Sequence, residues 1–510
     1  MSKQFELNDA SVVVVIGSGA GGGTVANELA QKGVDVVCLE AGKRLALSDV
    51  VNDPGVMLQK LGWNDPRKGT PVTTCKTVGG TTMRWSGITP RIQAHEFKAL
   101  STYGQMQDTT LIDWPITLEE LEPYYDKAEN KMGVTGTHGI PASAETNNYK
   151  LLKAGAKKIG YKEYTSTRTA INSVARDGRA ACRQIGFCHS GCAIGAKWST
   201  LYTEIPKAEG TGHFELRTEA MAVKLNHNDA GEVTGVIYAD SDGNLHEQKA
   251  RAVCVAGNVM ETTRLLFNST SNLFPDGLAN SSGHLGRNYT RHLMLSTFSI
   301  MPGEVNFHRG TRQSGLLFDE QYHKPERGFN GGYLIETVAT DPMTVAWAVG
   351  GWGESAADYL ENYTKLGGLW VTGEDPPQAS NRITLDDNER DQYGLPVPTL
   401  HYEFHENSLA MFEHAKTQCE ALLASMGGQK PATAIDLGGG CHNMGVARMS
   451  ADKKDGVTNR WGQAHDIPNL FVTDGSLFST SAAANPTLTI VALAIRQADH
   501  IAARMKNREL

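Results

Sequence analysis

The sequence predicts an α/β fold in which a Rossmann-like domain is combined with a second, α+β domain. The apolar run Val12–Ile16 breaks into glycines and continues as a helix-like segment to Ala30. Residues 251–266 repeat this order of strand, glycine and helix, which can return the chain to the same sheet. Residues 298–430 are richer in aromatic side chains and less regular. The expected parts are residues 1–297, residues 298–430 as an inserted second domain, and residues 431–510 as a return segment.

The first strand ends in a turn of the form G-x-G-x-x-G, made by Gly17, Gly19 and Gly22. In such a turn one glycine makes the bend, one lets the backbone approach a pyrophosphate, and one lets the helix pack on the strand. The next strand, Val34–Leu39, ends at Glu40, where an acid is expected to bind ribose hydroxyls. A glycine-rich loop alone is weak evidence, but strand, helix and acid together predict a dinucleotide site. The turn does not distinguish NAD from FAD.

Composition limits the classes of function. The chain has 510 residues, 40% hydrophobic and 20% charged, with a net charge of −8. No block of Lys and Arg stands out, so we expect no nucleic-acid partner. No apolar run approaches the ~20 residues that span a bilayer. The amino end shows no basic region followed by an apolar stretch, so we expect no export signal of its own.

Local patterns predict several further elements. Thr117 and Glu120 fit a capping box before a helix that reaches Met132, and Pro123 is expected to break that helix in two. Other helices are expected over 146–160, over 409–423 and from about 486 to 505, and short strands over 214–217, 220–225, 233–239 and 253–256.

Glycine-rich segments far apart in the sequence carry the other candidate residues. Gly79, Gly80, Thr81 and Thr82 indicate backbone that passes close to a flat or charged group, or else a turn between strands. Near the other end, His442 follows the run Gly438–Gly440. A strand that ends at Asp474, next to a helix that begins near Pro486, would place polar groups and a helix N-terminus at one site.

Three of the eight cysteines are bunched: Cys182, Cys188 and Cys192. Three cysteines suit a three-iron cluster, because each of three irons needs one protein ligand, whereas a four-iron cubane ordinarily needs four. Alternatively, His189 could complete a Cys₃His zinc site. Two of the cysteines could form a disulfide after export, or all three could be reduced and idle.

The order of these motifs resembles the glucose–methanol–choline (GMC) oxidoreductases from end to end. The resemblance rests on Gly17–Gly22 with Glu40, Gly79–Thr82, Ala256–Gly257, His442, and Asn485–Thr489. It is closest to the bacterial membrane-associated sugar dehydrogenases: FAD-dependent glucose dehydrogenase and the gluconate 2-dehydrogenase flavoprotein. It is specific at both ends of the chain and looser between about 298 and 430, where members of the family differ in substrate.

The resemblance implies a FAD enzyme that oxidises alcohols, with residues 298–430 as its substrate-binding domain. It places His442 as the base that takes the hydroxyl proton, a role that suits an imidazole with a pKa near neutrality. It places Asn485 as the donor that orients the substrate oxygen. Arg84 stands where some sugar-oxidising relatives carry a histidine joined to the flavin, so FAD is expected to be non-covalent. The expected FAD contacts are Gly17, Gly19, Gly22 and Glu40 at the adenosine and pyrophosphate end, and Gly80, Thr81, Asp474, Pro486 and Thr487 nearer the flavin.

Related sugar dehydrogenases hold a 3Fe-4S cluster on cysteines of this spacing, so Cys182, Cys188 and Cys192 are expected to bind one. Such enzymes work with a small chaperone-like subunit that carries the export signal and a cytochrome c that takes the electrons. We therefore expect a sugar or polyol dehydrogenase, at the periplasmic face of the membrane if a partner exports it and cytoplasmic otherwise. The alternatives are a soluble GMC sugar or glycoside oxidase that makes hydrogen peroxide, and a noncatalytic flavoprotein subunit.

Overall fold

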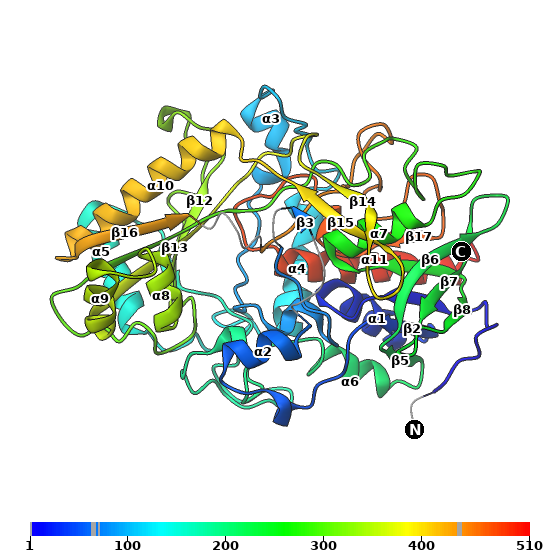
Figure 1. Ribbon diagram of the computed structural model, residues 1–510, viewed down its shortest axis with the longest axis horizontal. Coiled ribbons are helices and arrows are strands. Elements are labelled where there is room, and N and C mark those ends of the chain that lie inside the picture. The colour runs from blue at the N-terminus through cyan, green and yellow to red at the C-terminus, as the bar shows by residue number, and fades with distance from the viewer. Residues whose placement is uncertain (1–2, 63–67, 70–71, 436–440) are drawn as a thin grey trace.

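The computed structural model describes residues 3–62, 68–69, 72–435 and 441–510, which form two bodies side by side (Figure 1). One body is built on a parallel sheet and the other on an antiparallel sheet. The segment Gly438–Gly440, which precedes His442, lies outside the described residues.

The parallel sheet has the strand order β17-β9-β1-β2-β5. Every neighbouring pair in it is parallel, as expected for strands joined by crossover connections. Its strands are β1 (Val13–Ile16), β2 (Val36–Glu40), β5 (Phe214–Thr218), β9 (Ala252–Val255) and β17 (Leu470–Val472). The central strand β1 continues through the glycine turn into α1 (Ala20–Gln31), and β9 leads into α7 (Asn258–Asn268). Both predicted units of strand, glycine and helix are thus confirmed and lie in one sheet, which is the Rossmann-like core.

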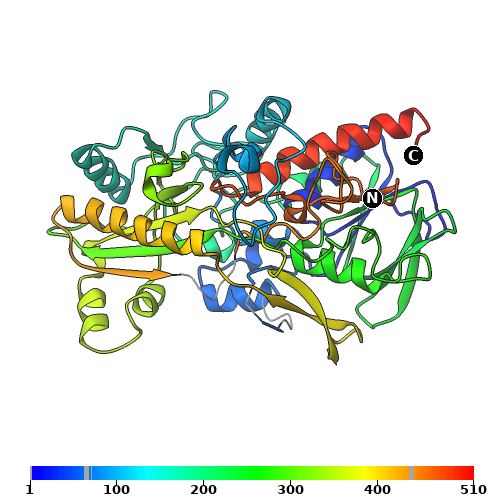
Figure 2. The same cartoon turned by 90° about the horizontal axis from the view of Figure 1, so that it is seen from above.

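The second body is a six-stranded antiparallel sheet of order β16-β10-β13-β12-β11-β4. Its strands are β4 (Tyr164–Ser166), β10 (Leu293–Ile300), β11 (Gly315–Leu317), β12 (Tyr333–Thr337), β13 (Leu366–Gly373) and β16 (Gln429–Ile435). The helices α5 (Asn147–Ile159) and α10 (Glu406–Ser425) cover one face, and α8 (Pro342–Ala348) and α9 (Glu354–Glu361) lie on the other side (Figure 2). Strand β4 and helix α5 join this body although they precede residue 298; the division at residues 298 and 430 stays a prediction.

Alternation along the strands decides which residues face the neighbouring body. Leu369 and Val371 of β13 pack with α10 in a buried apolar cluster that includes Met411. Residues one position away therefore point to the opposite face, toward the parallel-sheet body. On that face Leu334 of β12 packs against Ala483, which belongs to the return segment.

The other elements flank these two sheets. The remaining helices are α2 (Pro54–Lys60), α3 (Ala99–Tyr103), α4 (Leu118–Met132), α6 (Glu204–Glu209) and α11 (Thr487–Lys506), and the remaining strands are β3 (Lys68–Gly69), β6 (Met221–His227), β7 (Val233–Ala239), β8 (Leu245–Lys249), β14 (Arg382–Arg390) and β15 (Pro396–His401). The predicted strands over 214–256 and the helices over 146–160, 409–423 and 486–505 are confirmed within a few residues. None of the described helices combines the length and the hydropathy that a membrane span requires.

The expectation that Pro123 divides the helix after Thr117 is wrong. Helix α4 runs unbroken from Leu118 to Met132, with Pro123 inside it and the predicted capping box in place. A proline in this position removes one backbone hydrogen bond and crowds the preceding turn. Burial of the apolar face that includes Tyr125 offsets that cost, because this face packs in the largest apolar core together with α11.

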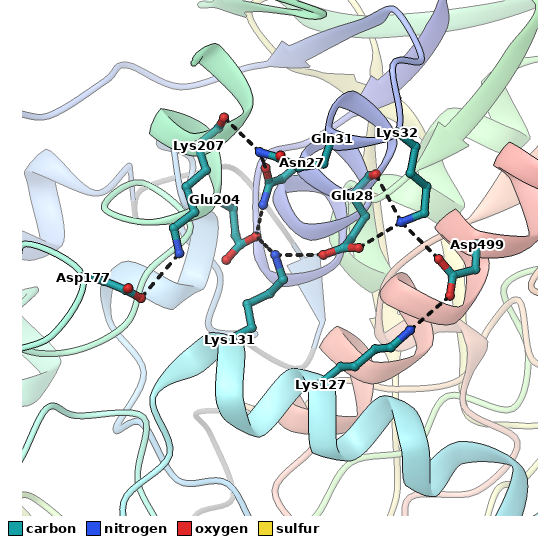
Figure 3. A network of polar contacts seen from close by, with 10 residues as sticks. All are labelled: Asn27, Glu28, Gln31, Lys32, Lys127, Lys131, Asp177, Glu204, Lys207 and Asp499. Atoms are coloured by element: carbon teal, nitrogen blue, oxygen red, sulfur yellow. Dashed lines mark hydrogen bonds and ion pairs between the residues drawn. The ribbon is translucent and has the colours of Figure 1, made fainter. Parts of the chain in front are cut away.

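A polar network fixes the helices behind the glycine turn (Figure 3). The Nζ atom of Lys131 on α4 lies 2.8 Å from an oxygen of Glu28 on α1 and 2.7 Å from an oxygen of Glu204 on α6. Glu204 is fully buried and also accepts a hydrogen bond from Asn27. The network therefore joins α1, α4 and α6 through one cation placed between two carboxylates.

Candidate functional site

A cavity of about 1370 Å³ lies where residues of both bodies meet. It collects predicted site residues from both ends of the chain. The predicted residues that line it are Gly17, Gly19, Glu40, Gly80, Thr81, Cys188, His442, Asp474, Asn485, Pro486 and Thr487. Gly22, Cys182 and Cys192 are not among its lining residues.

The three glycines of the first turn have different surroundings. Gly17 has a φ of +93°, and a Cβ atom added there would lie 2.4 Å from the carbonyl oxygen of Ala256. A Cβ on Gly22 would lie 1.9 Å from the carbonyl oxygen of Gly17, so only glycine allows α1 to pack this closely. A Cβ on Gly19 would meet nothing nearer than Gly80, at 3.9 Å. Gly17 thus makes the bend, Gly22 allows the packing, and Gly19 leaves open space beside the N-terminus of α1, as the motif requires.

Glu40 is buried at the end of β2 and is held by the glycine turn itself. Its carboxylate accepts hydrogen bonds from the backbone N–H and the hydroxyl of Ser18, at 3.0 and 2.6 Å, and from the backbone N–H of Gly42, at 2.8 Å. Burial raises the pKa of Glu40, and these donors oppose the shift. The carboxylate is therefore fixed at the rim of the cavity, on the strand end where a ribose is expected.

The second glycine segment forms a turn against the first. Gly79 and Gly80 have φ values of +94° and +51°, and a short 3-10 helix, η2 (Gly80–Met83), follows. The backbone N–H of Gly79 donates to the hydroxyl of Ser18 at 3.0 Å. A Cβ on Gly80 would lie 3.0 Å from the Cα of Gly19, so the two turns meet backbone to backbone at the cavity wall.

The return segment contributes an acid and a helix N-terminus. Asp474, just after β17, accepts a hydrogen bond from the hydroxyl of Thr262 at 2.6 Å and from the backbone N–H of Ser476 at 2.8 Å. Burial raises the pKa of Asp474. Helix α11 begins at Thr487 after Pro486, and both residues line the cavity. Its N-terminal N–H groups thus face the same space as those of α1, where they favour anionic or electron-rich groups.

His442 belongs to a chain of hydrogen bonds that fixes its tautomer. Its Nδ1 atom lies 2.9 Å from Nδ1 of His292, and Nε2 of His292 lies 3.2 Å from the carbonyl oxygen of Ser481. Because a carbonyl only accepts, Nε2 of His292 carries the proton, and in the neutral ring Nδ1 is then an acceptor. His442 must therefore donate from Nδ1, which leaves its Nε2 with a free lone pair.

Burial keeps both rings of this pair neutral. Burial lowers the pKa of His292 to about 4. The pKa of His442 lies well below its usual value because the ring is buried. The ring planes are nearly perpendicular, with centroids 4.9 Å apart. His442 is thus a neutral acceptor at physiological pH, which is the state that a general base requires.

Asn485 is anchored by a buried glutamate of the second body. Glu336 of β12 is fully buried and accepts a hydrogen bond from the hydroxyl of Thr372 at 3.3 Å, and the side chain of Asn485 lies beside it and favours its charged form. Burial raises the pKa of Glu336 to about 7. The Oδ1 atom of Asn485 is buried and has no hydrogen-bond partner among the described residues. The amide is therefore oriented from one side by Glu336 while it lines the cavity on the other.

The same end of the cavity is rich in cations. Arg84 and Arg312 both line it, and Lys197 is buried behind its wall. The Nζ atom of Lys197 donates to three carbonyl oxygens, including that of Cys188 at 2.6 Å. Burial lowers the pKa of Lys197 to about 8, while the neighbouring thiols Cys188 and Cys192 act in the opposite direction.

The three bunched cysteines are free thiols on one loop. Burial raises the pKa of Cys182 to about 11, and the charges of Cys188 and Cys192 add to that shift, so the three groups are electrostatic neighbours. Among the described residues their sulfur atoms do not all lie within 4.8 Å of one another. In a tetrahedral zinc site, with Zn–S bonds of ~2.3 Å, sulfur atoms lie about 3.8 Å apart. At least one pair of these sulfur atoms is therefore farther apart than in a tetrahedral zinc site, whereas a three-iron cluster separates its three ligands onto different irons.

Sequence reasoning missed His292, Glu336 and Arg312. His292 stands in no recognisable motif, and its partner His442 lies 150 positions away. Glu336 did leave a signal, since it is a charged residue within the apolar run Tyr333–Thr337. A carboxylate in a strand that is buried on both sides needs a specific partner, which in this fold is Asn485.

Comparisons with known proteins find similar proteins along almost the whole chain. Two family models, both described as GMC oxidoreductase, match residues 49–294 and 377–494. The 2-methyl-1,2-propanediol dehydrogenase of Mycolicibacterium austroafricanum is 32% identical, over 98% of this chain and 96% of its own length. The fructose dehydrogenase large subunit of Gluconobacter japonicus is 27% identical, over 96% of this chain and 97% of its own length. A solved structure of Aspergillus oryzae formate oxidase matches with a TM-score of 0.71 at 16% identity, over 97% of this chain and 98% of that chain, and shows the shared fold.

Proposed function

Because this chain belongs to the GMC oxidoreductase family, we propose that it oxidises an alcohol group of a sugar or sugar-derived substrate to a carbonyl with bound FAD. The glycine turn, Glu40, and the N-termini of α1 and α11 fit a dinucleotide cofactor, because they leave open space beside free backbone donors. When bound, FAD supplies the redox chemistry by accepting a hydride at N5. We assign Gly17, Gly19, Gly22 and Glu40 to its adenosine and pyrophosphate end, and Gly80, Thr81, Asp474, Pro486 and Thr487 to its flavin end.

In this proposal His442 takes the proton from the substrate hydroxyl at its Nε2 atom. The observation that carries it is the hydrogen-bond chain from the Ser481 carbonyl through His292, which leaves that atom as an acceptor. As Nε2 gains the proton, the positive charge is shared with His292 through the Nδ1 hydrogen bond. Asn485, oriented by Glu336, holds the substrate oxygen near that base. The buried position of both histidines limits competition from bulk water.

We also propose that Cys182, Cys188 and Cys192 hold a 3Fe-4S cluster that passes electrons to a cytochrome-type partner. In support, the thiols are reduced, share one loop, and lie beside Lys197, a buried cation that would balance anionic sulfur. One of the relatives is itself named a large subunit, which supports an assembly with other chains. A small subunit with an export signal would place the protein at the periplasmic face of the membrane.

Anaerobic bleaching of the flavin tests the enzymatic assignment. Purified protein is expected to absorb near 450 nm, roughly where oxidised flavins absorb, and to lose this colour with some members of a panel of aldoses, aldonates, polyols and glycosides. His442→Ala should slow bleaching by ~10²-fold or more while it retains the flavin, because general bases contribute factors of this size. His401→Ala, an exposed histidine on β15, is the matched control. An unchanged rate in His442→Ala would refute its role as the base.

Metal analysis tests the cluster separately. About three irons per chain, with a low-temperature EPR signal in anaerobically prepared protein, are expected for the three-cysteine ligand set. Stoichiometric zinc, or no metal, would remove the electron relay. Rapid peroxide formation in air would then favour the oxidase alternative.

A further inference from the structure

The cavity holds a tryptophan at its reactive end. In the antiparallel pair β12–β13, Glu336 lies opposite Trp370. Paired residues point to the same face of a sheet, so the indole lies on the face from which Glu336 reaches Asn485. Trp370 is partly exposed and lines the cavity. A ring held by Asn485 would therefore have an aromatic surface beside it.

A second apolar surface lies at the outer end of the same cavity. Met343 and Trp347 of α8 are one helical turn apart, line the cavity, and have 81% and 65% of their surfaces exposed. From another part of the chain, Ile185 and Phe187 of the cysteine loop also line it and are exposed. Large apolar side chains gathered at a cavity rim are typical of a surface that is covered when a ligand binds.

Helix α8 is fixed in place, so this surface is pre-formed. Asp341 caps the helix by accepting hydrogen bonds from the backbone N–H and the hydroxyl of Thr344, at 3.0 and 2.8 Å. Val345 anchors the opposite side in the core. Just before the helix, the carbonyl oxygen of Ala339 accepts a hydrogen bond from Arg312 at 3.1 Å. The indole of Trp347 would therefore lose little conformational entropy when a ligand stacks on it.

The neighbouring Trp352 differs in one decisive respect. It is 88% exposed and lies between α8 and α9, but it is not a lining residue of the cavity. Trp347 is thus distinguished from a merely exposed tryptophan by its place in the wall that leads to Asn485.

We propose that Met343 and Trp347 form an outer subsite that stacks a second ring of the substrate, so that the enzyme prefers glycosides to free monosaccharides. This inference rests on the proposed function, because it concerns the same cavity. Two aromatic surfaces, Trp370 within and Trp347 at the rim, suit a molecule of two linked rings. A sugar ring presents apolar C–H faces that pack on an indole, and an aromatic aglycone would use the same surface. No covalent step takes place at this subsite.

The test compares Trp347→Ala with Trp352→Ala in the FAD-loaded enzyme. Each sugar that bleaches the flavin is supplied as the monosaccharide, its phenyl glycoside and its disaccharide, and kcat/KM is measured for each. Trp347→Ala should lower the ratio of disaccharide to monosaccharide kcat/KM by about 5- to 20-fold, as expected for the loss of one stacked ring. Trp352→Ala should keep that ratio, and Trp347→Phe should recover most of it.

Each outcome decides the proposal. A loss confined to the phenyl glycosides would assign the subsite to aromatic aglycones, and a loss on both would assign it to rings in general. If Trp347→Ala leaves kcat/KM relative to the monosaccharide unchanged for both the disaccharides and the phenyl glycosides, or if Trp352→Ala lowers it equally, the proposal is overturned. If no alcohol bleaches the flavin in any variant, the proposed function fails. Calorimetric titration of a disaccharide into wild type and Trp347→Ala would then still decide the subsite, which is rejected if both bind alike.

Discussion

At the scale of single residues, the candidate site depends on pairs that fix each other's protonation. His292 does not take the substrate proton in the proposed chemistry, yet it decides which nitrogen of His442 is free. Its acceptor, the Ser481 carbonyl, cannot donate, so this one backbone oxygen sets the donor and the acceptor in both hydrogen bonds of His292. Glu336 acts on Asn485 in a similar way, because a buried carboxyl group beside an amide favours the orientation that turns the amide NH₂ toward it.

His292→Leu should therefore slow flavin reduction by about 10- to 100-fold without loss of FAD, because His442 can then adopt either tautomer. His292 is neutral above about pH 4 and accepts from Nδ1 of His442, a hydrogen bond that favours protonated His442. Its removal should therefore lower the pKa of His442 and move the acid limb of the rate profile to lower pH. The measurement is the pH dependence of anaerobic bleaching in wild type and variant. A profile with the same acid limb and the same rate would show that His292 only fills space.

At the scale of elements, the helices around the glycine turn are held by charges as well as by apolar packing. Lys131 compensates two carboxylates at once, and one of them, on Glu204, is fully buried (Figure 3). Lys127, one turn earlier on α4, pairs with Asp499 of α11 at 3.4 Å on a more exposed surface. The two lysines thus share a helix but differ in burial, which decides the value of their ion pairs.

Lys131→Met should lower the free energy of unfolding by about 3 kcal/mol, because it leaves a buried carboxylate without its cation. Lys127→Met should cost less than about 1 kcal/mol, because its pair is solvated. Denaturant unfolding of the two variants and wild type, all loaded with FAD, measures both values. An equal loss of unfolding free energy in the two variants would mean that the lysines stabilise the protein through their aliphatic side-chain carbons rather than through their charges.

At the scale of the whole molecule, a pair of buried carboxyls joins segments from distant parts of the chain. Glu96 accepts a hydrogen bond from the backbone N–H of Ala483 at 2.7 Å, and Glu374, at the end of β13, accepts one from the hydroxyl of Tyr103 at 3.0 Å. Ligand atoms of the two glutamates and of His95 lie within 4.8 Å of one another. Burial raises the pKa of Glu96 to about 7 and that of Glu374 to about 8, and repulsion between the two adds to the latter.

The sign of the resulting pH dependence follows from these raised values. Between the ordinary carboxyl range and about pH 8, the folded state binds more protons at Glu374 than the unfolded state, so stability falls as pH rises. Glu374→Gln should flatten this fall and raise the Tm relative to wild type at pH 8. Thermal unfolding from pH 5 to 8.5 measures it, with Glu326→Gln, an exposed glutamate nearby, as the control. Parallel curves for wild type and Glu374→Gln would contradict the raised pKa.

The sequence by itself determined the parts that depend on local sterics. Only glycine tolerates the φ of Gly17 and the close contact at Gly22, so the turn, its strand and its helix could be read directly. The same holds for the capped start of α4. The order of motifs sufficed to identify the family, and the structure places ten of the predicted flavin-site and catalytic residues, from Gly17 to Thr487, around one cavity.

Only the tertiary structure decided which distant side chains pair. His292 with His442, Glu336 with Asn485, and Glu96 with Glu374 each join segments more than 140 positions apart. Such contacts depend on which face of a strand meets which loop after the two sheets pack, and no local pattern encodes that. The same reason explains Pro123, since the burial that keeps α4 continuous is supplied by α11 from the other end of the chain.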